Sequence, residues 1–284
     1  MVMTLEVIYW NIDPEIVNIF GISIRYYSLF FTGGLIVSAI ILQKLFVWED
    51  LSVEHFDRLI IYCGIGILAG ARLGHCLFYQ PSYFLLHPVE MLLPIQQQPD
   101  GGYKFIGYQG LASHGGALGL VIAIIFYCYK CKQSLLATID LIAIVAPLGA
   151  GFIRLANLMN SEILGMPSNV PWAFVFTMVD NTPRHPAQLY EAVIYLIIFV
   201  IMLFIKVRHG KVQSGLFLGL SLTMIFGARF MIEFIKERQV IFEYNMALDM
   251  GQILSIPFIA TGIAFIFFAL IKDRNAEKKK AVSL

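Results

Sequence analysis

The sequence has little charge and few cysteines. Charged residues make up 14% of its 284 residues, whereas soluble domains carry about 25%. The net charge of +1 supplies no basic surface, so we expect no nucleic-acid partner. The four cysteines lie in or beside apolar runs and indicate no disulfide framework. The first basic residue is Arg25, so the charged start of a cleaved signal peptide is missing. A soluble enzyme and a disordered chain both fit poorly.

Apolar residues are abundant instead, at 58% of the chain with a mean hydropathy of +0.76. They gather in seven stretches close to the 17–25 residues that a membrane span needs. We therefore predict an all-α membrane protein, a single domain over 1–284 with seven transmembrane helices. The predicted spans are 24–46, 58–79, 110–131, 135–158, 187–207, 214–235 and 251–271, with longer polar segments at 80–109 and 159–186. Glycines repeat every four residues at 66, 70 and 74, at 115 and 119, and at 215 and 219, which favours close helix packing.

The distribution of lysine and arginine predicts the orientation. Twelve of these residues fall in alternate loops and the C-terminal tail, against five in the opposite segments. Since cytoplasmic loops carry the positive excess, we expect a periplasmic N-terminus and a cytoplasmic C-terminus. The segments 80–109 and 159–186 are then periplasmic.

Three arginines lie inside the apolar stretches, where each costs roughly 2.5–3.5 kcal/mol at the bilayer centre. Helical rise places Arg72 and Arg229 about 21–22 Å from the cytoplasmic ends of their spans, and Arg154 near the outer end of its own. His114 begins the third span at the same side. We therefore expect a cationic site in the outer half of the membrane, suited to a lipid phosphate. The alternative is that each arginine pairs with an acid, such as Glu233 one turn after Arg229.

Two local patterns point to chemistry at this level. His114 is followed by Gly115 and Gly116, which leave the imidazole uncovered and would let a substrate approach the backbone. An imidazole with an ordinary pKa near 6.5 can accept a proton at neutral pH. A polar stripe leaves the fourth span, and a capped helix end does not account for all of it: Arg154, Asn157, Asn160 and Glu162. By contrast, Cys128 and Cys131 form a lone CxxC pair, for which helix-end packing is favoured over a metal or redox site.

Several short motifs along the chain are together more specific than any one of them alone. They are RYY at 25–27, HGG at 114–116, the run from 151 to 165, Arg229 with Glu233, RHPAQLYE at 184–191 and MGQILSIP at 250–257. Together they resemble the prolipoprotein diacylglyceryl transferase family over most of the chain. The sequence departs from the family pattern at His75, Ser113 and Ala156, which affects local packing and headgroup fit.

The resemblance implies a seven-span protein of the bacterial inner membrane with its site facing the periplasm. The family moves the diacylglyceryl group of phosphatidylglycerol to the lipobox cysteine in the signal peptide of a lipoprotein precursor. A thioether forms and glycerol phosphate leaves. The family's essential histidine and second arginine match His114 and Arg229, its lipid-binding signature arginine matches Arg154, and its first-span tyrosine matches Tyr27.

The chemistry of the residues extends this assignment. We expect His114 to take the thiol proton, because a thiol with a pKa near 8.5 is mostly protonated at neutral pH. Arginines in a dry site would stabilise the departing phosphate. We expect Asn157, Asn160 and Arg72 to join Arg154 and Tyr27 in binding phosphatidylglycerol. Glu162 and Glu233 are expected to hold arginines in place. The remaining supporting residues are Gly165, His185, Gln188, Tyr190, Glu191, Gly115 and Gly116. No metal-ligand cluster is visible, and we expect no metal or organic cofactor.

Three other functions explain some of these residues but not all of the observations. A transporter of an anionic lipid or metabolite explains the arginines equally well, but it predicts polar access from both faces. A scaffold packed by glycine faces leaves His114 and the asparagine stripe unexplained. An intramembrane protease lacks a serine–histidine or paired-aspartate arrangement in the spans.

Overall fold

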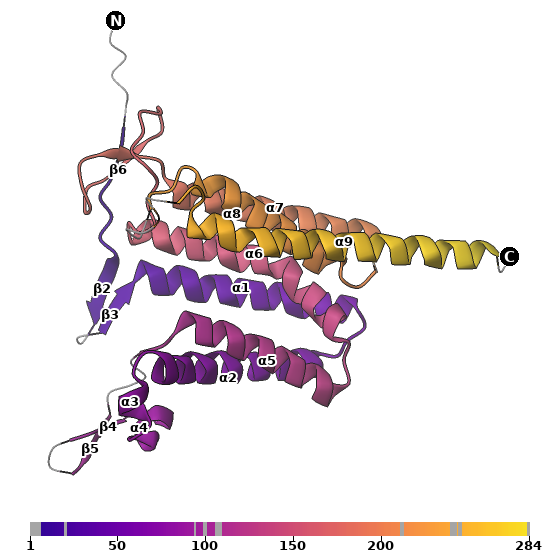
Figure 1. The fold of residues 1–284 in the computed structure, drawn as a ribbon, viewed down its shortest axis with the longest axis horizontal. Coiled ribbons are helices and arrows are strands. Elements are labelled where there is room, and N and C mark those ends of the chain that lie inside the picture. The colour runs from indigo at the N-terminus through magenta and orange to yellow at the C-terminus, as the bar shows by residue number, and fades with distance from the viewer. Residues whose placement is uncertain are drawn as a thin grey trace, which may run out of the picture. The chain divides into compact units, whose positions relative to one another are not determined.

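The protein is described by a computed structural model that covers residues 7–19, 22–93, 95–98, 101–105, 110–210, 213–238, 243 and 246–282 (Figure 1). Its contacts form two compact units. The first unit comprises residues 1–45 and 139–284, and the second comprises residues 46–138. The expectation of one membrane domain stays a prediction, and each unit is described by itself.

The predicted number of spans is confirmed, since seven described helices are long and apolar enough to cross a membrane. They are α1 (Tyr26–Trp48), α2 (Val53–Phe78), α5 (Ser113–Cys131), α6 (Leu135–Met159), α7 (Ala187–His209), α8 (Leu216–Glu233) and α9 (Met250–Val282). The last helix continues beyond the predicted end at 271, past the ends of α7 and α8 (Figure 1). Alanine, glutamate and lysine, which are strong helix formers, fill that extension.

The purely helical prediction is wrong for the connecting segments, which contain short strands. In the first unit, β1 (Ile8–Trp10) pairs in parallel with β6 (Phe174–Phe176), and β7 (Pro183–Arg184) pairs antiparallel on the other side of β6. A hairpin of β2 (Glu15–Ile19) and β3 (Ile22–Arg25) precedes α1. In the second unit, α3 (Pro81–Phe84), α4 (Pro88–Leu92) and the hairpin β4 (Ile95–Gln97) and β5 (Tyr103–Phe105) follow α2. These runs are too short to register as spans, yet they are rich in the β-branched and aromatic residues that strands favour.

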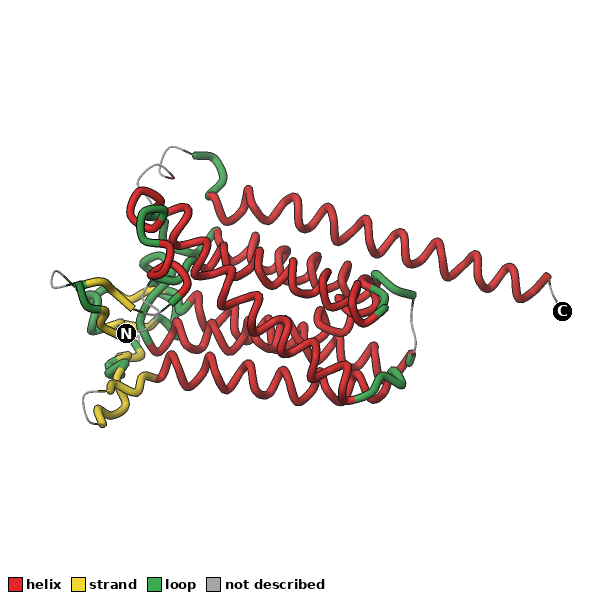
Figure 2. The backbone as a smooth tube through the Cα atoms, turned by 90° about the horizontal axis from the view of Figure 1, so that it is seen from below, coloured by secondary structure: helices red, strands yellow, loops and turns green. Residues whose placement is uncertain are grey.

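Strand β1 ties the N-terminal segment to the end of α6. The Trp10 indole donates a hydrogen bond to the Leu158 carbonyl at 3.1 Å, and its ring lies 5.4 Å from that of Phe174. A small core of Leu158, Leu164, Phe174 and Phe176 forms beneath it. This core fixes the chain as it leaves α6, where the polar stripe lies. Figure 2 shows the strands of this unit gathered at one end of its helices.

Small residues let the helices of the first unit approach each other. Gly219 of α8 lies against α9, where a Cβ would come within 2.7 Å of the Gly262 carbonyl. The paired glycine, Gly215, does not serve packing as predicted. It adopts φ +100 immediately before α8, and its N–H donates to the Asp140 carboxylate at 2.6 Å. Leu218 N–H donates to the same carboxylate at 2.8 Å, so Asp140 caps a helix 75 residues away.

In the second unit, the glycine repeats of α2 and α5 bring two backbones into contact, as predicted. A Cβ on Gly70 would collide with the Gly115 carbonyl, and one on Gly74 would lie 2.8 Å from the Gly115 Cα. A Cβ on Gly119 would collide with the Gly66 carbonyl. Such contact leaves no room for any side chain larger than hydrogen.

We predict that Gly70→Ala lowers the stability of the protein by about 1–3 kcal/mol, the usual cost of overpacking. Gly64→Ala is the matched control on the same helix, because a Cβ there meets nothing within 4 Å. The control should raise stability slightly, since alanine is the better helix former. Thermal unfolding of the detergent-solubilised protein measures both, and an equal shift for the two variants would contradict the packing assignment.

Candidate active site

The polar stripe at the end of α6 forms one connected group. Arg154 donates from Nη1 to the Asn157 Oδ1 at 3.2 Å. Asn157 in turn donates to the Glu162 carboxylate at 2.7 Å, and Asn160 donates to it at 3.5 Å. The chain can turn back this sharply because Ser161 and Ile163 adopt left-handed backbone angles. The predicted spacing therefore brings all four polar residues together.

The centre of the group is the carboxylate of Glu191 in the second turn of α7. Its side chain is fully buried, and Arg154 Nε lies 2.9 Å from its Oε2 atom. Lys236 Nζ lies 3.7 Å from the other oxygen, Oε1. A buried carboxylate is strongly disfavoured unless cations compensate it, and here two do so, one at each oxygen. Glu191, expected only to brace the site, is its main anchor.

The start of α7 is fastened to the chain that leaves α6. The fully buried Gln188 donates to the Glu162 carbonyl at 2.6 Å. Gly165 N–H donates to the His185 carbonyl at 3.1 Å, and a Cβ on Gly165 would collide with that same carbonyl. Tyr190 also contacts this segment, with its hydroxyl 3.2 Å from His185 Nδ1. Glycine is therefore required at 165 by a close backbone approach.

Lys236 is a member of the group that the sequence analysis missed. It is one of the five basic residues predicted on the periplasmic side, yet its side chain is only 5% exposed. Its Nζ atom lies 3.1 Å from Glu233 Oε2 and 3.7 Å from Glu191 Oε1. The backbone of residues 235–237 runs beside residues 164–166, with Met166 N–H bonded to the Ile235 carbonyl at 2.8 Å. Its position three residues after Glu233 is the signal that could have identified it.

Arg229 lies in the same region but is bound differently. Tyr195, a buried residue of α7, is within electrostatic range of both Arg154 and Arg229, so two of the three predicted arginines act on the same buried residue. Arg229 forms no hydrogen bond or ion pair with another residue that the structure describes. The predicted supports need correction. Glu233 pairs with Lys236 rather than with Arg229, and Glu162 reaches Arg154 only through Asn157.

A second group of ion pairs holds the chain beside Lys236. The buried Arg184 pairs with Asp180 at 2.6 Å and with Glu237 at 2.9 Å. The hydrogen bond from Arg184 lowers the pKa of Asp180 below its usual value, because it stabilises the charged carboxylate. Glu237 is thereby fixed beside Lys236 in the chain.

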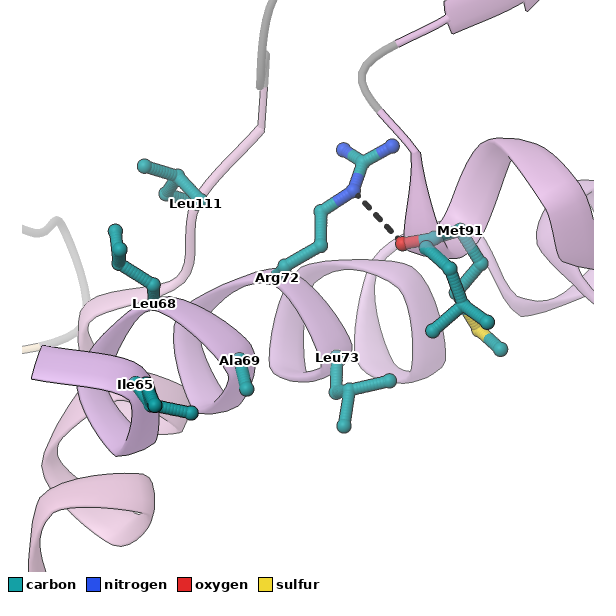
Figure 3. Close-up of a pocket in the computed structure, with 8 residues that line it drawn as sticks. Ile65, Leu68, Ala69, Arg72, Leu73, Met91 and Leu111 are labelled. Carbon is teal, nitrogen blue, oxygen red and sulfur yellow. Dashed lines mark hydrogen bonds between the residues drawn. The ribbon is translucent and has the colours of Figure 1, made fainter. Parts of the chain in front are cut away.

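Arg72 belongs to the second unit and is bound mainly by backbone. The guanidinium donates to the Met91 carbonyl at 3.2 Å and to the Glu90 carbonyl at 2.6 Å, and it lies 4.9 Å from the Phe84 ring (Figure 3). A cation at the end of α4 complements the carbonyl end of that helix. Arg72 is therefore 7% exposed and fastens α3 and α4 to α2.

Two cavities meet at Arg72. One of about 300 Å³ is apolar and open along α2; Figure 3 shows Ile65, Leu68, Leu73 and Leu111 around it. The other, of about 470 Å³, is polar, with His75, Tyr83, Glu90 and Gln96 among its lining residues. Arg72 lies on the boundary between an apolar and a polar compartment.

The remaining predicted residues stand at the starts of α5 and α1. His114 is the second residue of α5 and is exposed. Gly115 serves packing, because α2 occupies the face that was assigned to an approaching substrate. Gly116 is buried opposite Ala71. Tyr27 begins α1, with its ring stacked 6.4 Å from Phe31. The roles of His114, Tyr27 and Arg72 stay predictions.

Comparison with known proteins gives a consistent result. The sequence model of the family described as prolipoprotein diacylglyceryl transferase matches residues 14–268. A protein of Bacteroides fragilis named phosphatidylglycerol–prolipoprotein diacylglyceryl transferase is 54% identical over 260 residues, covering 91% of this chain and 94% of the relative. Proteins with the same name from Chloroherpeton thalassium and Porphyromonas gingivalis are 41% and 38% identical and cover 97% and 94% of this chain, and 98% and 97% of the relatives.

We predict that Glu191→Gln lowers stability by about 3–5 kcal/mol, because it leaves two buried cations without their shared carboxylate. Glu54→Gln is the matched control, since it removes the same charge from an exposed pair with Arg58. The control should leave the unfolding temperature nearly unchanged. Equal thermal stability of the two variants would show that Glu191 is not an anchor.

We also predict a pH-dependent contribution from Glu90. The Tyr83 hydroxyl donates to its carboxylate at 2.6 Å and lowers its pKa, helped by the Gln97 N–H at 2.8 Å. Because the folded pKa lies below the unfolded value, the stabilisation is present at neutral pH and is lost as pH falls through the folded pKa. Hydrogen exchange of residues 81–93 should therefore be faster in Glu90→Gln than in the wild type at pH 7. The difference should shrink as the pH falls through the folded pKa of Glu90, and a difference that stays the same at all pH values would contradict the assignment.

Proposed function

This chain belongs to the prolipoprotein diacylglyceryl transferase family, and on that premise we propose that it transfers the diacylglyceryl group of phosphatidylglycerol to the lipobox cysteine of prolipoproteins. The cysteine sulfur forms a bond to the glycerol carbon while the bond from that carbon to the phosphate ester oxygen breaks. The thiol proton passes to a base, and glycerol phosphate leaves. The product is a thioether-linked diacylglyceryl cysteine, the first step of lipoprotein maturation.

The observation that carries the proposal is the arginine pair of the first unit. Arg154 is oriented by Glu191 and Asn157. Arg229 is within electrostatic range of Tyr195, as Arg154 is, and has no acidic partner among the described residues. A phosphodiester brings one negative charge, and more charge develops on its oxygens as the bond breaks. Oriented guanidinium groups in a site with little water stabilise such charge. We assign Arg154 to headgroup binding and Arg229 to the developing charge on the leaving group.

Four further residues complete the proposed headgroup site. Asn157 and Asn160 carry amides next to Arg154 that can bind headgroup oxygens. Tyr27 would contribute a hydroxyl from the start of α1. Arg72 would act from the boundary between its apolar and polar cavities, which matches the division of a phospholipid into chains and headgroup.

His114 is the proposed base for the thiol. Its side chain is exposed at the start of α5 and makes no hydrogen bond to a described residue, so its imidazole is available to a substrate. We place this end of α5, together with the Arg154 group, at the periplasmic side of the bacterial inner membrane. The basic C-terminal extension of α9 then lies in the cytoplasm, as the distribution of lysine and arginine predicts.

The proposal is tested with purified protein, micelles that contain phosphatidylglycerol, and a peptide that carries a lipobox cysteine. Mass spectrometry should show the peptide gaining a diacylglyceryl group, and a peptide with alanine in place of cysteine should gain nothing. His114→Ala should lower kcat by about 10²–10⁴-fold, the usual contribution of a general base. His209→Ala, an exposed histidine at the end of α7, is the control. Full turnover by His114→Ala would remove the base assignment, and an unmodified peptide with the wild type would overturn the function.

A further inference from the structure

Lys236 occupies an unusual place for a lysine that follows a membrane helix. Its ammonium group is buried between carboxylates from two helices, at 3.1 Å from Glu233 of α8 and 3.7 Å from Glu191 of α7. The Lys236 side chain is only 5% exposed. Lysine seldom gives up hydration to this extent unless several negative groups compensate it. The two carboxylates provide that compensation.

The backbone leaves Lys236 little freedom to lie elsewhere. Residues 235–237 pair with residues 164–166, through Met166 N–H to Ile235 O at 2.8 Å and Glu237 N–H to Leu164 O at 3.0 Å. Arg184 also holds the Glu237 side chain at 2.9 Å. The lysine is therefore supplied to the two acids by a braced segment, not by a free loop.

Glu233 is placed where it could pair with Arg229 instead. The two residues are one helical turn apart on α8, a spacing at which opposite charges contact each other. In the structure Glu233 binds Lys236, and Arg229 has no ion pair with a described residue. The absence of a side chain at Gly251 makes this arrangement possible, because a Cβ there would lie 2.5 Å from the Glu233 carboxyl carbon. The carboxylate thus rests against the first turn of α9, whose N–H groups favour a negative charge.

We propose that Lys236 is a positioning residue that holds Glu233 away from Arg229 and so keeps the Arg229 guanidinium available for the phosphate of the lipid substrate. This inference rests on the proposed function. In a medium of low dielectric constant a carboxylate one turn away would compete strongly with the substrate for the arginine. The lysine removes that competitor without touching the substrate itself.

The proposal predicts a specific pattern of rescue. Lys236→Met should raise the KM for phosphatidylglycerol about tenfold or more, since the freed Glu233 then occupies Arg229. Lys236→Arg should stay within about threefold of the wild type, because it keeps the cation. Adding Glu233→Gln to Lys236→Met should return the KM to that of Glu233→Gln alone. Adding Glu237→Gln should give no rescue, because that neighbouring carboxylate pairs with Arg184.

Initial rates at increasing mole fractions of phosphatidylglycerol, read by mass spectrometry of the lipobox peptide, give the kcat and KM of each variant. A role in overall charge balance alone predicts equal rescue by Glu233→Gln and Glu237→Gln, and that result would overturn the proposal. An unchanged KM in folded Lys236→Met would overturn it as well. If Lys236→Met does not fold, the comparison of Lys236→Met/Glu233→Gln with Glu233→Gln decides, since the proposal requires equal KM values. A wild type that modifies no peptide would instead refute the proposed function.

Discussion

The site of the first unit depends on one buried carboxylate. Glu191 has no exposed side-chain surface, and it draws Arg154 from α6 and Lys236 from the chain after α8. A charge in such a place is tolerated only if cations stay beside it. The ends of three segments far apart in the sequence are therefore held together by one electrostatic requirement. The hydrogen bonds among Arg154, Asn157 and Glu162 extend this order into the connecting chain.

The chain between the spans does more than connect them. The pairing of residues 164–166 with 235–237, the Arg184 ion pairs and the small core under β1 all brace the end of α6 and the end of α8. A group of charges can be held in fixed positions only by a scaffold of this kind, because long cationic side chains have many rotamers. The short strands, which the apolar spans did not predict, thus help to position the charged group.

Spans and stripes could be predicted because they depend on local sequence. The length of an apolar run and the three-residue spacing of Arg154, Asn157 and Asn160 require no knowledge of distant contacts. For Lys236, local spacing indicates only the pairing with Glu233 three residues earlier. Its pairing with Glu191, 45 residues earlier, could not be predicted, because it depends on how the chain turns after α8. Gly215 and Gly115 show the same limit. A glycine in such a repeat can pack against another helix or leave space for a substrate. Only the neighbouring structure decides: Gly115 packs against α2, whereas Gly215 lies in the capped start of α8.

Arg72 binds α4 by hydrogen bonds to peptide carbonyls rather than to side chains. Every amino acid presents that same oxygen, so this attachment does not depend on which side chains residues 90 and 91 carry. A substitution in α4 that leaves the backbone in place would keep the attachment, whereas loss of the one arginine would release it.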